Sequence, residues 1–225
     1  MSEKTVSVTC PDCGETGDFT IWTSIDLVEN PPMEEKIRSG SLFRYSCPQC
    51  GIITKIAYPT LIHDAGKKQM IYLASNEETY QSTLEMYSKG GSSAAEGLLD
   101  GEHTVRLFRS VPDLMEYFRI RKAELDDRVV ELLRLFVYHE LKENNPDLLA
   151  DQLYFEQSEE GEDPFVFELM RKDEIIGRIG FKEEAYENMK SMFQDTIERL
   201  SEGRIVFDAD WASQVFAQQD PDATE

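Results

Sequence analysis

Short runs of alternating apolar and polar residues, separated by turn residues, fill the first third of the chain. Residues 19–25 alternate most clearly, and their aromatic and β-branched side chains predict a strand. Turn residues at 64–67 separate two further runs, which predicts a hairpin. The other strand-like runs are residues 6–9, 42–46, 52–58, 61–62 and 70–73. Asn30-Pro31-Pro32 interrupts the pattern, and the whole predicts a β-rich module over residues 1–75.

The middle of the chain changes from alternation to helical spacing. Residues 77–87 carry a weak helical pattern, and glycine, serine and alanine dominate residues 88–97. We therefore interpret residues 76–102 as a weak helix followed by a flexible linker. A strand is predicted over residues 103–111, and Pro112 then suits the first turn of another helix.

The strongest helical pattern starts at Leu125 and ends at Asn144-Asn145-Pro146. Its apolar side chains recur at helical spacing over a broad stripe, so we expect a long helix that is buried on much of its surface. The stripe comprises Leu125, Val129, Val130, Leu132, Leu133, Phe136, Val137 and Leu141.

The last third has the pattern of strands followed by a helix. Strands are predicted at residues 152–157, 165–171 and 175–181. The amphipathic helix after them is marked by Tyr186, Met189, Met192, Phe193, Ile197 and Leu200. We expect residues 205–207 to return to a sheet and residues 218–225 to form a frayed tail. The fold class predicted is α+β, with the β module followed by a mixed helix and strand region over residues 103–217.

The chain is strongly acidic. It has 44 acidic and 23 basic residues among 225, which gives a net charge of -21. Residues 140–225 hold 23 acidic and 8 basic residues, net -15, and the other 139 hold 21 and 15, net -6. Such a surface repels nucleic acid, so direct nucleic-acid binding is not expected, and it attracts a basic protein. High charge also favours solubility, which is the simpler interpretation.

The first residues, Met1-Ser2-Glu3-Lys4, lack the apolar run of a signal peptide. No stretch reaches the roughly 20 apolar residues of a membrane helix. We therefore expect a cytoplasmic location without membrane association. Thiols stay reduced there, so four cysteines in two close pairs indicate a metal site rather than disulfides.

The four cysteines occupy two copies of one motif, Cys10-Pro11-Asp12-Cys13-Gly14 and Cys47-Pro48-Gln49-Cys50-Gly51. Zn²⁺ prefers four soft or borderline ligands in a tetrahedron, and each pair of thiolates can occupy one edge of it. A glycine after the second cysteine permits the tight turn that this needs. We predict a zinc-ribbon-like module in which Cys10, Cys13, Cys47 and Cys50 bind one structural zinc ion. Four protein ligands leave no open position for a substrate.

Two alternatives to zinc stay open at this point. A Cys-Pro-x-Cys pair could be a thiol-redox site, but such sites are followed by a helix, whereas strand-like residues follow both pairs here. Four unrelated core cysteines would not explain the repeated spacing.

The doubled Cys-Pro-x-Cys motif resembles that of the CpXC-domain family. The resemblance extends over roughly residues 6–140 and includes the strand near Val105–Leu107 and the segments 112–116 and 125–132. It implies zinc and a ribbon followed by helices, and it implies no reaction. The chain departs from the family pattern at Glu124, where a glycine is expected.

The histidines and one acidic stretch have simple interpretations. His63, His103 and His139 do not form a metal-binding spacing, so we expect them to face solvent or to be hydrogen-bonded. Residues 156–163 hold five acids, which predicts a solvated loop, with an anionic docking surface as the alternative.

Two pairs of aspartates could meet a cation or act in catalysis. Asp126 and Asp127 open the long helix, and Asp208 and Asp210 precede Trp211. Helix capping is the favoured interpretation of both pairs. The sequence contains no glycine-rich phosphate loop or nucleophile motif.

Three functions are consistent with these features. The favoured one is a zinc-stabilised acidic protein-interaction module whose partner has a basic surface. The second is an enzyme with a carboxylate site between the ribbon and the helical part, resting on Asp126 and Asp127. The third is an acidic mimic of nucleic acid that binds a basic protein. A homo-oligomer is compatible with each.

Overall fold

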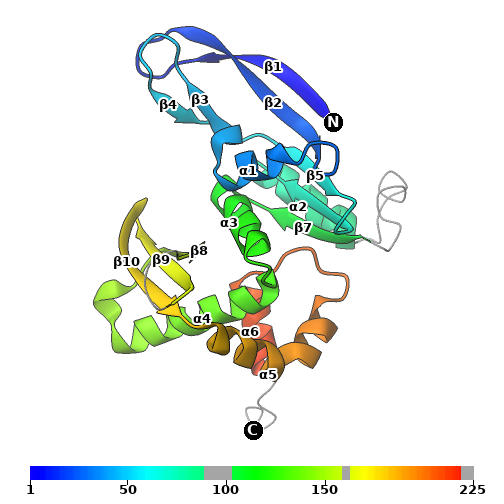
Figure 1. Cartoon of the computed structure of the whole chain (residues 1–225), viewed down its shortest axis with the longest axis vertical. Helices are drawn as coiled ribbons and strands as arrows, with labels where there is room; N and C mark the ends of the chain where they lie inside the picture. Colours follow the sequence, from blue (N-terminus) through cyan, green and yellow to red (C-terminus); the bar gives the residue numbers. More distant parts are fainter. Residues whose placement is uncertain (89–102, 159–162, 219–225) are drawn as a thin grey trace. The chain divides into compact units, whose positions relative to one another are not determined.

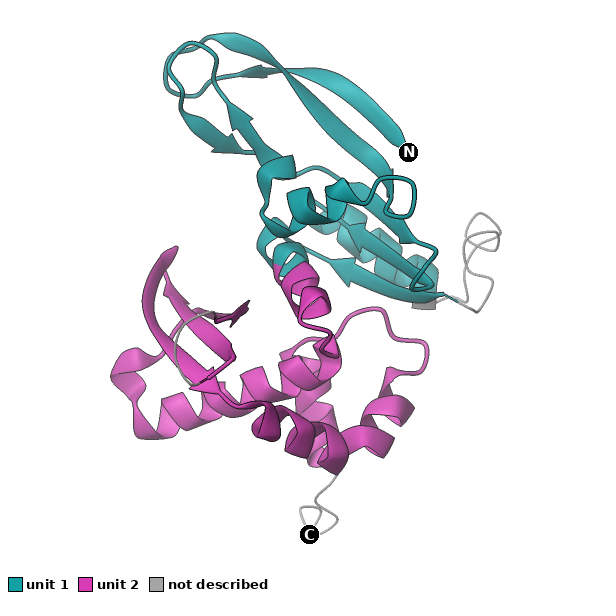
Figure 2. Ribbon diagram, in the orientation of Figure 1, with its two compact units in different colours: residues 1–115 teal, residues 116–225 magenta. Residues whose placement is uncertain are grey.

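The computed structural model of the chain describes residues 1–88, 103–158 and 163–218 (Figure 1). It divides into two compact units, unit 1 with residues Met1–Met115 and unit 2 with residues Glu116–Glu225 (Figure 2). The fold is α+β, as predicted. Most of the predicted linker at 88–97, part of the acidic stretch at 156–163 and most of the tail at 218–225 lie outside the described residues.

A five-stranded sheet forms most of unit 1, with the strand order β1-β2-β5-β6-β7. The strands are β1 Ser2–Thr9, β2 Thr16–Asp26, β5 Thr60–Asp64, β6 Gln69–Leu73 and β7 Thr104–Phe108. The pairs β1/β2 and β5/β6 are antiparallel, whereas β2/β5 and β6/β7 are parallel. The predicted strand at 19–25, the hairpin around 64–67 and the strand within 103–111 are confirmed.

A second, two-stranded sheet of β3 Arg44–Ser46 and β4 Ile53–Lys55 follows in unit 1. The strand predicted at 52–58 is therefore shorter than expected. The helix α1 Pro32–Arg38, which the sequence pattern did not predict, precedes this sheet and is followed by a 3₁₀ turn at Ser41–Phe43. Proline at the first helical position needs no amide hydrogen bond, so Pro32 begins a helix where the sequence suggested only a break.

Two helices complete the chain up to the long helix. The weak helix predicted at 77–87 is confirmed as α2 Glu77–Ser88, and Asn76 accepts the amide of Thr79 at 2.9 Å in its first turn. The helix predicted from Pro112 is α3 Val111–Lys122. It ends with Glu124 in the left-handed region, φ 59°. The Leu125 amide reaches back to the Ile120 carbonyl at 3.2 Å, a helix end that normally places glycine where Glu124 stands.

Unit 2 combines helices with an antiparallel sheet in the order β10-β9-β8. Its strands are β8 Gln152–Gln157, β9 Phe165–Arg171 and β10 Glu174–Phe181, which confirms all three predictions. Its helices are α4 Asp127–Asn144, α5 Glu183–Ser201 and α6 Ala209–Ala217, and a 3₁₀ turn at Pro146–Leu148 follows α4. None of the helices in the described ranges is both long enough and apolar enough to span a membrane.

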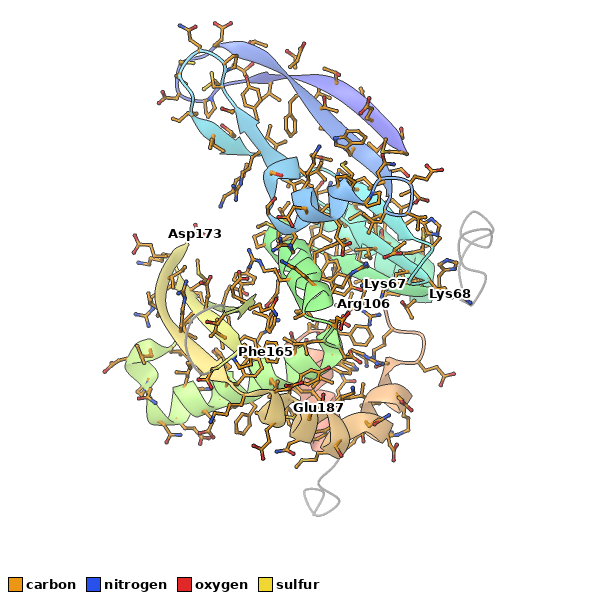
Figure 3. All side chains as sticks on the ribbon, in the orientation of Figure 1. Lys67, Lys68, Arg106, Phe165, Asp173 and Glu187 are labelled. Carbon is orange, nitrogen blue, oxygen red and sulfur yellow. The ribbon has the colours of Figure 1, made fainter. Side chains whose placement is uncertain are left out.

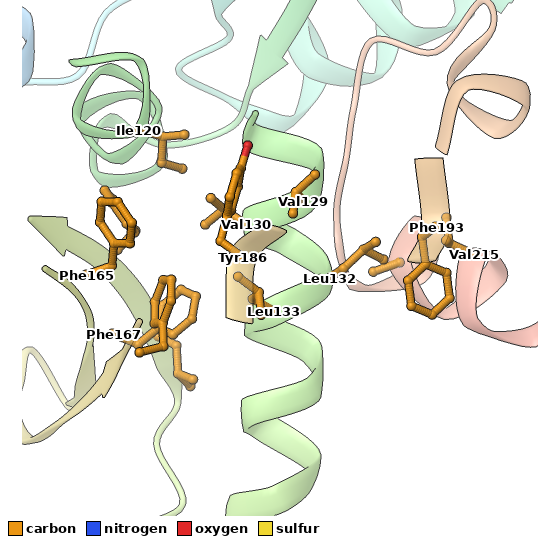
Figure 4. Packing of buried hydrophobic residues seen from close by; sticks show 14 of the residues in the cluster. Ile120, Val129, Val130, Leu132, Leu133, Phe165, Phe167, Tyr186, Phe193 and Val215 are labelled. Atoms are coloured by element: carbon orange, nitrogen blue, oxygen red, sulfur yellow. The ribbon is translucent and has the colours of Figure 1, made fainter. Parts of the chain in front are cut away.

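The apolar core of unit 2 forms around α4. Figure 4 shows Phe165 and Phe167 of β9 on one side of α4 and Phe193 and Val215 on the other. Val130 and Leu132 are fully buried, as is Trp211 of α6, whose indole N–H donates to the Leu200 carbonyl at 3.1 Å. The prediction of a long and largely buried helix is thus confirmed.

Three expectations about unit 2 are wrong. Residues 205–207 form no strand: Ile205 is buried in the connection before α6, and the Phe207 ring meets the Trp211 ring edge-on at 5.0 Å. Phe136 and Met192 fit the helical stripes of α4 and α5, yet they are 50% and 61% exposed. The apolar stripe of each helix is therefore wider than the surface that its neighbours cover.

Candidate metal centre

The two cysteine motifs form two turns, one after β1 and one after β3, and the turns face each other. The Sγ atoms of Cys10 and Cys50 lie 3.7 Å apart, and those of Cys13 and Cys47 lie 3.6 Å apart. All four Sγ atoms lie within 4.8 Å of one another. The four cysteines that the sequence singles out are thus brought together, and none is in a disulfide.

The two turns are built alike. The amides of Gly14 and Gly51 donate to the carbonyls of Cys10 and Cys47, at 3.1 and 3.0 Å. The amides of Cys10 and Cys47 donate to the carbonyls five residues later, at 2.8 and 2.9 Å. Both glycines have φ 75°, a backbone conformation that a side chain disfavours. The repeated Cys-Pro-x-Cys-Gly motif therefore produces a repeated geometry.

Backbone amides point toward the sulfur atoms. The amides of Cys50 and Gln49 donate toward the Cys47 sulfur and, against its desolvation, lower the pKa of Cys47 to about 7. The Glu15 amide lowers the pKa of Cys13 in the same way, but desolvation and the three neighbouring thiols outweigh it and raise this pKa to about 12. Neighbouring thiols disfavour a second and third thiolate because like charges repel, and a bound cation would remove this penalty.

The sulfur spacing fits a single metal ion. A tetrahedron with metal–sulfur bonds of about 2.3 Å has edges of about 3.8 Å, close to the measured 3.6 and 3.7 Å. A disulfide would need about 2.05 Å. Strands β2 and β4, rather than helices, follow the two turns, which is not the arrangement of a thiol-redox site. The four cysteines can thus hold a metal ion with every position filled by protein.

Residues 8–134, more than half of the chain, match the family model described as CpXC protein. The chain belongs to the CpXC protein family. The resemblance expected over roughly residues 6–140 is confirmed. No curated protein and no solved structure matched the chain. The family match and the four-cysteine cluster together make this CpXC protein a candidate metal-binding protein.

The burial of the site is uneven. Cys10 and Cys47 are 1% and 2% exposed, whereas Cys13 and Cys50 are exposed. The first cysteine of each motif thus faces the interior and the second faces the surface. A metal ion here would be attached to the protein core on one side only.

The other residues singled out in the sequence have structural partners in this CpXC protein. Asp126 caps α4: its carboxylate accepts the Arg128 amide at 2.9 Å and pairs with the Arg128 guanidinium at 2.6 Å. Asp208 caps α6 by accepting the Trp211 amide at 3.0 Å. Capping, the favoured interpretation of Asp126 and Asp208, is therefore what the structure shows.

The histidines also lie apart from the cysteines. His63 Nδ1 lies 3.2 Å from the Asp26 carboxylate, and the His63 and His103 rings lie 5.5 Å apart. His139 is exposed and meets the Tyr138 ring edge-on. Among the residues that the structure describes, the four cysteines are the one group of three or more His, Cys, Asp or Glu side chains that converges closely enough to hold a metal.

Two features of interest were missed at the level of sequence. Acidic side chains share one face of α5, at intervals of three, eight and three residues that helical periodicity could have revealed. Tyr45, two residues before Cys47 on β3, is 3% exposed, and its hydroxyl lies against Gly17 at the start of β2. Alternation along a strand places residues 45 and 47 on one face, which was the available signal.

Proposed function

We propose that this CpXC protein binds one Zn²⁺ ion through Cys10, Cys13, Cys47 and Cys50, and that the ion shapes unit 1 without taking part in a reaction. The observation that carries the proposal is the convergence of the four sulfur atoms at the edge length of a tetrathiolate site. Zinc sites with four protein ligands are structural because they lack an open position. A reducing compartment such as the cytoplasm keeps these thiols available.

Metal analysis of the protein purified from its native host tests the choice of zinc. We expect one zinc per chain, lost in Cys47→Ser and retained in Ser46→Ala, which alters the exposed neighbour on β3. Thiolate-bound iron absorbs visible light, so a coloured protein with one iron per chain would contradict the proposal. A wild-type protein whose unit 1 stays folded after a chelator has removed its metal would contradict it as well.

We further propose that unit 2 docks on a protein with a basic surface. Four exposed acids of α5, Glu184, Glu187, Asp195 and Glu198, recur at helical spacing on the side opposite the buried Tyr186, Phe193 and Ile197. Figure 3 shows the side chains of α5, with Glu187 labelled. The row from 184 to 198 extends about 21 Å at 1.5 Å per residue. Residues 140–225 carry net -15, so a basic partner is attracted over a distance.

Affinity capture from the native host, with and without salt, tests this docking. The variant neutralises three row acids, as Glu184→Gln, Glu187→Gln and Asp195→Asn. The control removes the same charge from exposed acids of unit 1, as Glu3→Gln, Asp18→Asn and Glu29→Gln. We expect a partner that is lost at high salt, lost from the α5 variant and kept by the control.

Equal loss from both variants would show that net charge, and not the α5 row, attracts the partner. Duplex DNA added to the captured complex separates the third candidate function from the first. If DNA releases the partner from the wild-type protein, the row imitates a nucleic-acid backbone. If DNA leaves it bound, the docking is specific to this protein.

A further inference from the structure

The two-stranded sheet of β3 and β4 has one face that is exposed to solvent (Figure 1). Side chains alternate along a strand, so every second residue of each strand lies on this face. Its members, which we call the ribbon face, are Arg44, Ser46, Ile53 and Lys55. All four are exposed, and Ile53 is 62% exposed, whereas Tyr45 on the opposite face is 3% exposed. One side of the sheet is thus packed and the other is a surface of unit 1.

Two basic side chains lie directly opposite each other on the ribbon face. Arg44 pairs with Lys55 across the two strands, and neither makes an ion pair with a described residue. Like charges in this position destabilise a sheet. The surrounding sequence adds no opposite charge, because residues 36–63 hold four basic and no acidic residues in a chain with 44 acids among 225. A repulsive basic pair in an acid-free segment of an acidic chain indicates a surface for an anionic partner.

A surface that complements the ribbon face lies on α5 of the same chain. Asp195 and Glu198 of its acidic row are exposed, and neither makes an ion pair with a described residue. Three residues apart on a helix, their Cβ atoms are separated by about 5–6 Å, and the Cβ atoms of a directly opposite strand pair by about 4.5–5.5 Å. Met192, one turn before Asp195, is 61% exposed. Each surface therefore has two like charges at a matching spacing and one exposed apolar side chain.

The net charge of the chain does not prevent a contact between these two surfaces in different copies. At physiological salt, exposed charges more than about 8 Å apart are largely screened, whereas charges in contact are screened much less. The net charge of -21 on each copy is therefore felt weakly. Opposite charges that meet on the two surfaces still attract.

We propose that the C-terminal half of α5 in one copy docks on the ribbon face of a second copy, with acids against bases and Met192 against Ile53. This inference rests on the docking function proposed for unit 2 and names its partner. Used reciprocally, the two surfaces close a dimer, which is the commonest symmetric assembly. Both surfaces are small, so the dimer is reversible rather than permanent.

Sedimentation of the full-length protein tests the proposal by charge reversal. The ribbon variant is Arg44→Glu with Lys55→Glu, and the helix variant is Asp195→Lys with Glu198→Lys. We expect the wild type to dimerise increasingly with concentration at physiological salt and to dissociate at high salt. Each variant alone should dimerise at least about tenfold more weakly, because like charges then face each other. An equal mixture of the two variants should dimerise again, because both contacts then join opposite charges.

The matched control reverses two charges elsewhere on unit 1. Lys4→Glu with Lys67→Glu changes the net charge as much as the ribbon variant does, and both lysines are exposed and lie outside β3 and β4. We expect this control to dimerise like the wild type. Metal content is measured for every variant because β3 and β4 flank a cysteine turn. The helix variant leaves unit 1 unchanged, so it tests the contact even if the ribbon variant loses its metal.

Two results overturn the inference: a wild type that is monomeric at every concentration, or a mixture that stays monomeric although the wild type dimerises. A labelled single-stranded oligonucleotide that binds this monomer, and not the ribbon variant, would assign the ribbon face to nucleic acid instead. The docking proposed for unit 2 survives these results if a basic protein is captured from the native host and lost from the α5 variant. A capture that yields neither another protein nor a further copy of this chain contradicts both proposals.

Discussion

In unit 1, four sulfur atoms join the turn after β1 to the turn after β3, whereas in unit 2 a continuous apolar cluster joins three helices to a sheet. The sulfur atoms need a cation before all four can ionise together. The phenylalanines of β9 and the valines of α4 need only each other. The stability of the cysteine cluster therefore depends on the metal in the surrounding solution, whereas the stability of the apolar cluster depends on the area that it buries. The two units of one chain should therefore respond differently to the same treatment.

Removal of the metal should have the largest effect. We predict that a chelator, or Cys47→Ser, unfolds residues 1–75, because metal binding and folding are coupled in such sites and structural zinc contributes on the order of 10 kcal/mol. Strands β8–β10 and helices α5 and α6 should keep their protection. Hydrogen exchange followed by mass spectrometry reports both units in one experiment. An unchanged exchange pattern over residues 1–75 in the metal-free protein would refute this prediction.

Acid should reproduce this effect by a different route. Metal binds only thiolates, and in the metal-free protein the pKa of Cys13 is raised to about 12 and that of Cys50 is also raised. Both thiols are therefore protonated at neutral pH and must each lose a proton on loading. Zinc affinity should fall by at least about 100-fold for each unit of decreasing pH. Chelator competition at several pH values measures the slope, and a slope clearly below two protons would contradict the raised pKa values.

A single core substitution should have the opposite effect, destabilising unit 2 and leaving unit 1 with its metal. Phe167 is fully buried and stacks on Phe181 with ring centroids 5.1 Å apart. We expect Phe167→Ala to destabilise unit 2 by about 3–5 kcal/mol while one zinc stays bound in unit 1. Chemical denaturation with metal analysis measures both. Val166→Ala, on the opposite face of the same strand, is the control and should cost about 1 kcal/mol or less.

The elements of unit 2 were easier to predict than those of unit 1. Alternation over residues 165–171 and helical spacing over 186–200 each extend over several repeats, so local pattern and tertiary packing agree. In unit 1, α1 has only seven residues, and the two prolines at its start make the sequence look like a break between elements rather than a helix. Burial of Met33 and Ile37 against the rest of the unit stabilises this short helix, and a pattern two residues long cannot reveal that.

The candidate metal ligands were predictable because cysteine spacing carries the geometry of the site directly. The surroundings of the ligands were not. Tyr45 is one aromatic residue among many in the sequence, and only the fold places Gly17 against its hydroxyl. Phe136 shows that a sequence pattern can also overstate burial. Its spacing fits the buried stripe of α4, but the neighbouring elements do not extend far enough to cover it. Sequence periodicity gives the face of a helix, and tertiary structure determines how much of that face is covered.

The smallest predicted effect concerns Glu124, in the turn between α3 and α4. Glu124 has φ 59°, and its amide donates to the Arg121 carbonyl at 3.1 Å. A non-glycine residue in this conformation costs about 1 kcal/mol, partly offset by the greater freedom of glycine in the unfolded chain. Glu124→Gly should therefore stabilise the protein by about 0.5 kcal/mol. Glu187→Gly, in the regular part of α5, should destabilise it by about 1 kcal/mol. Opposite shifts of the denaturation midpoint from the same substitution would show that backbone conformation, and not the loss of one charge, decides the sign.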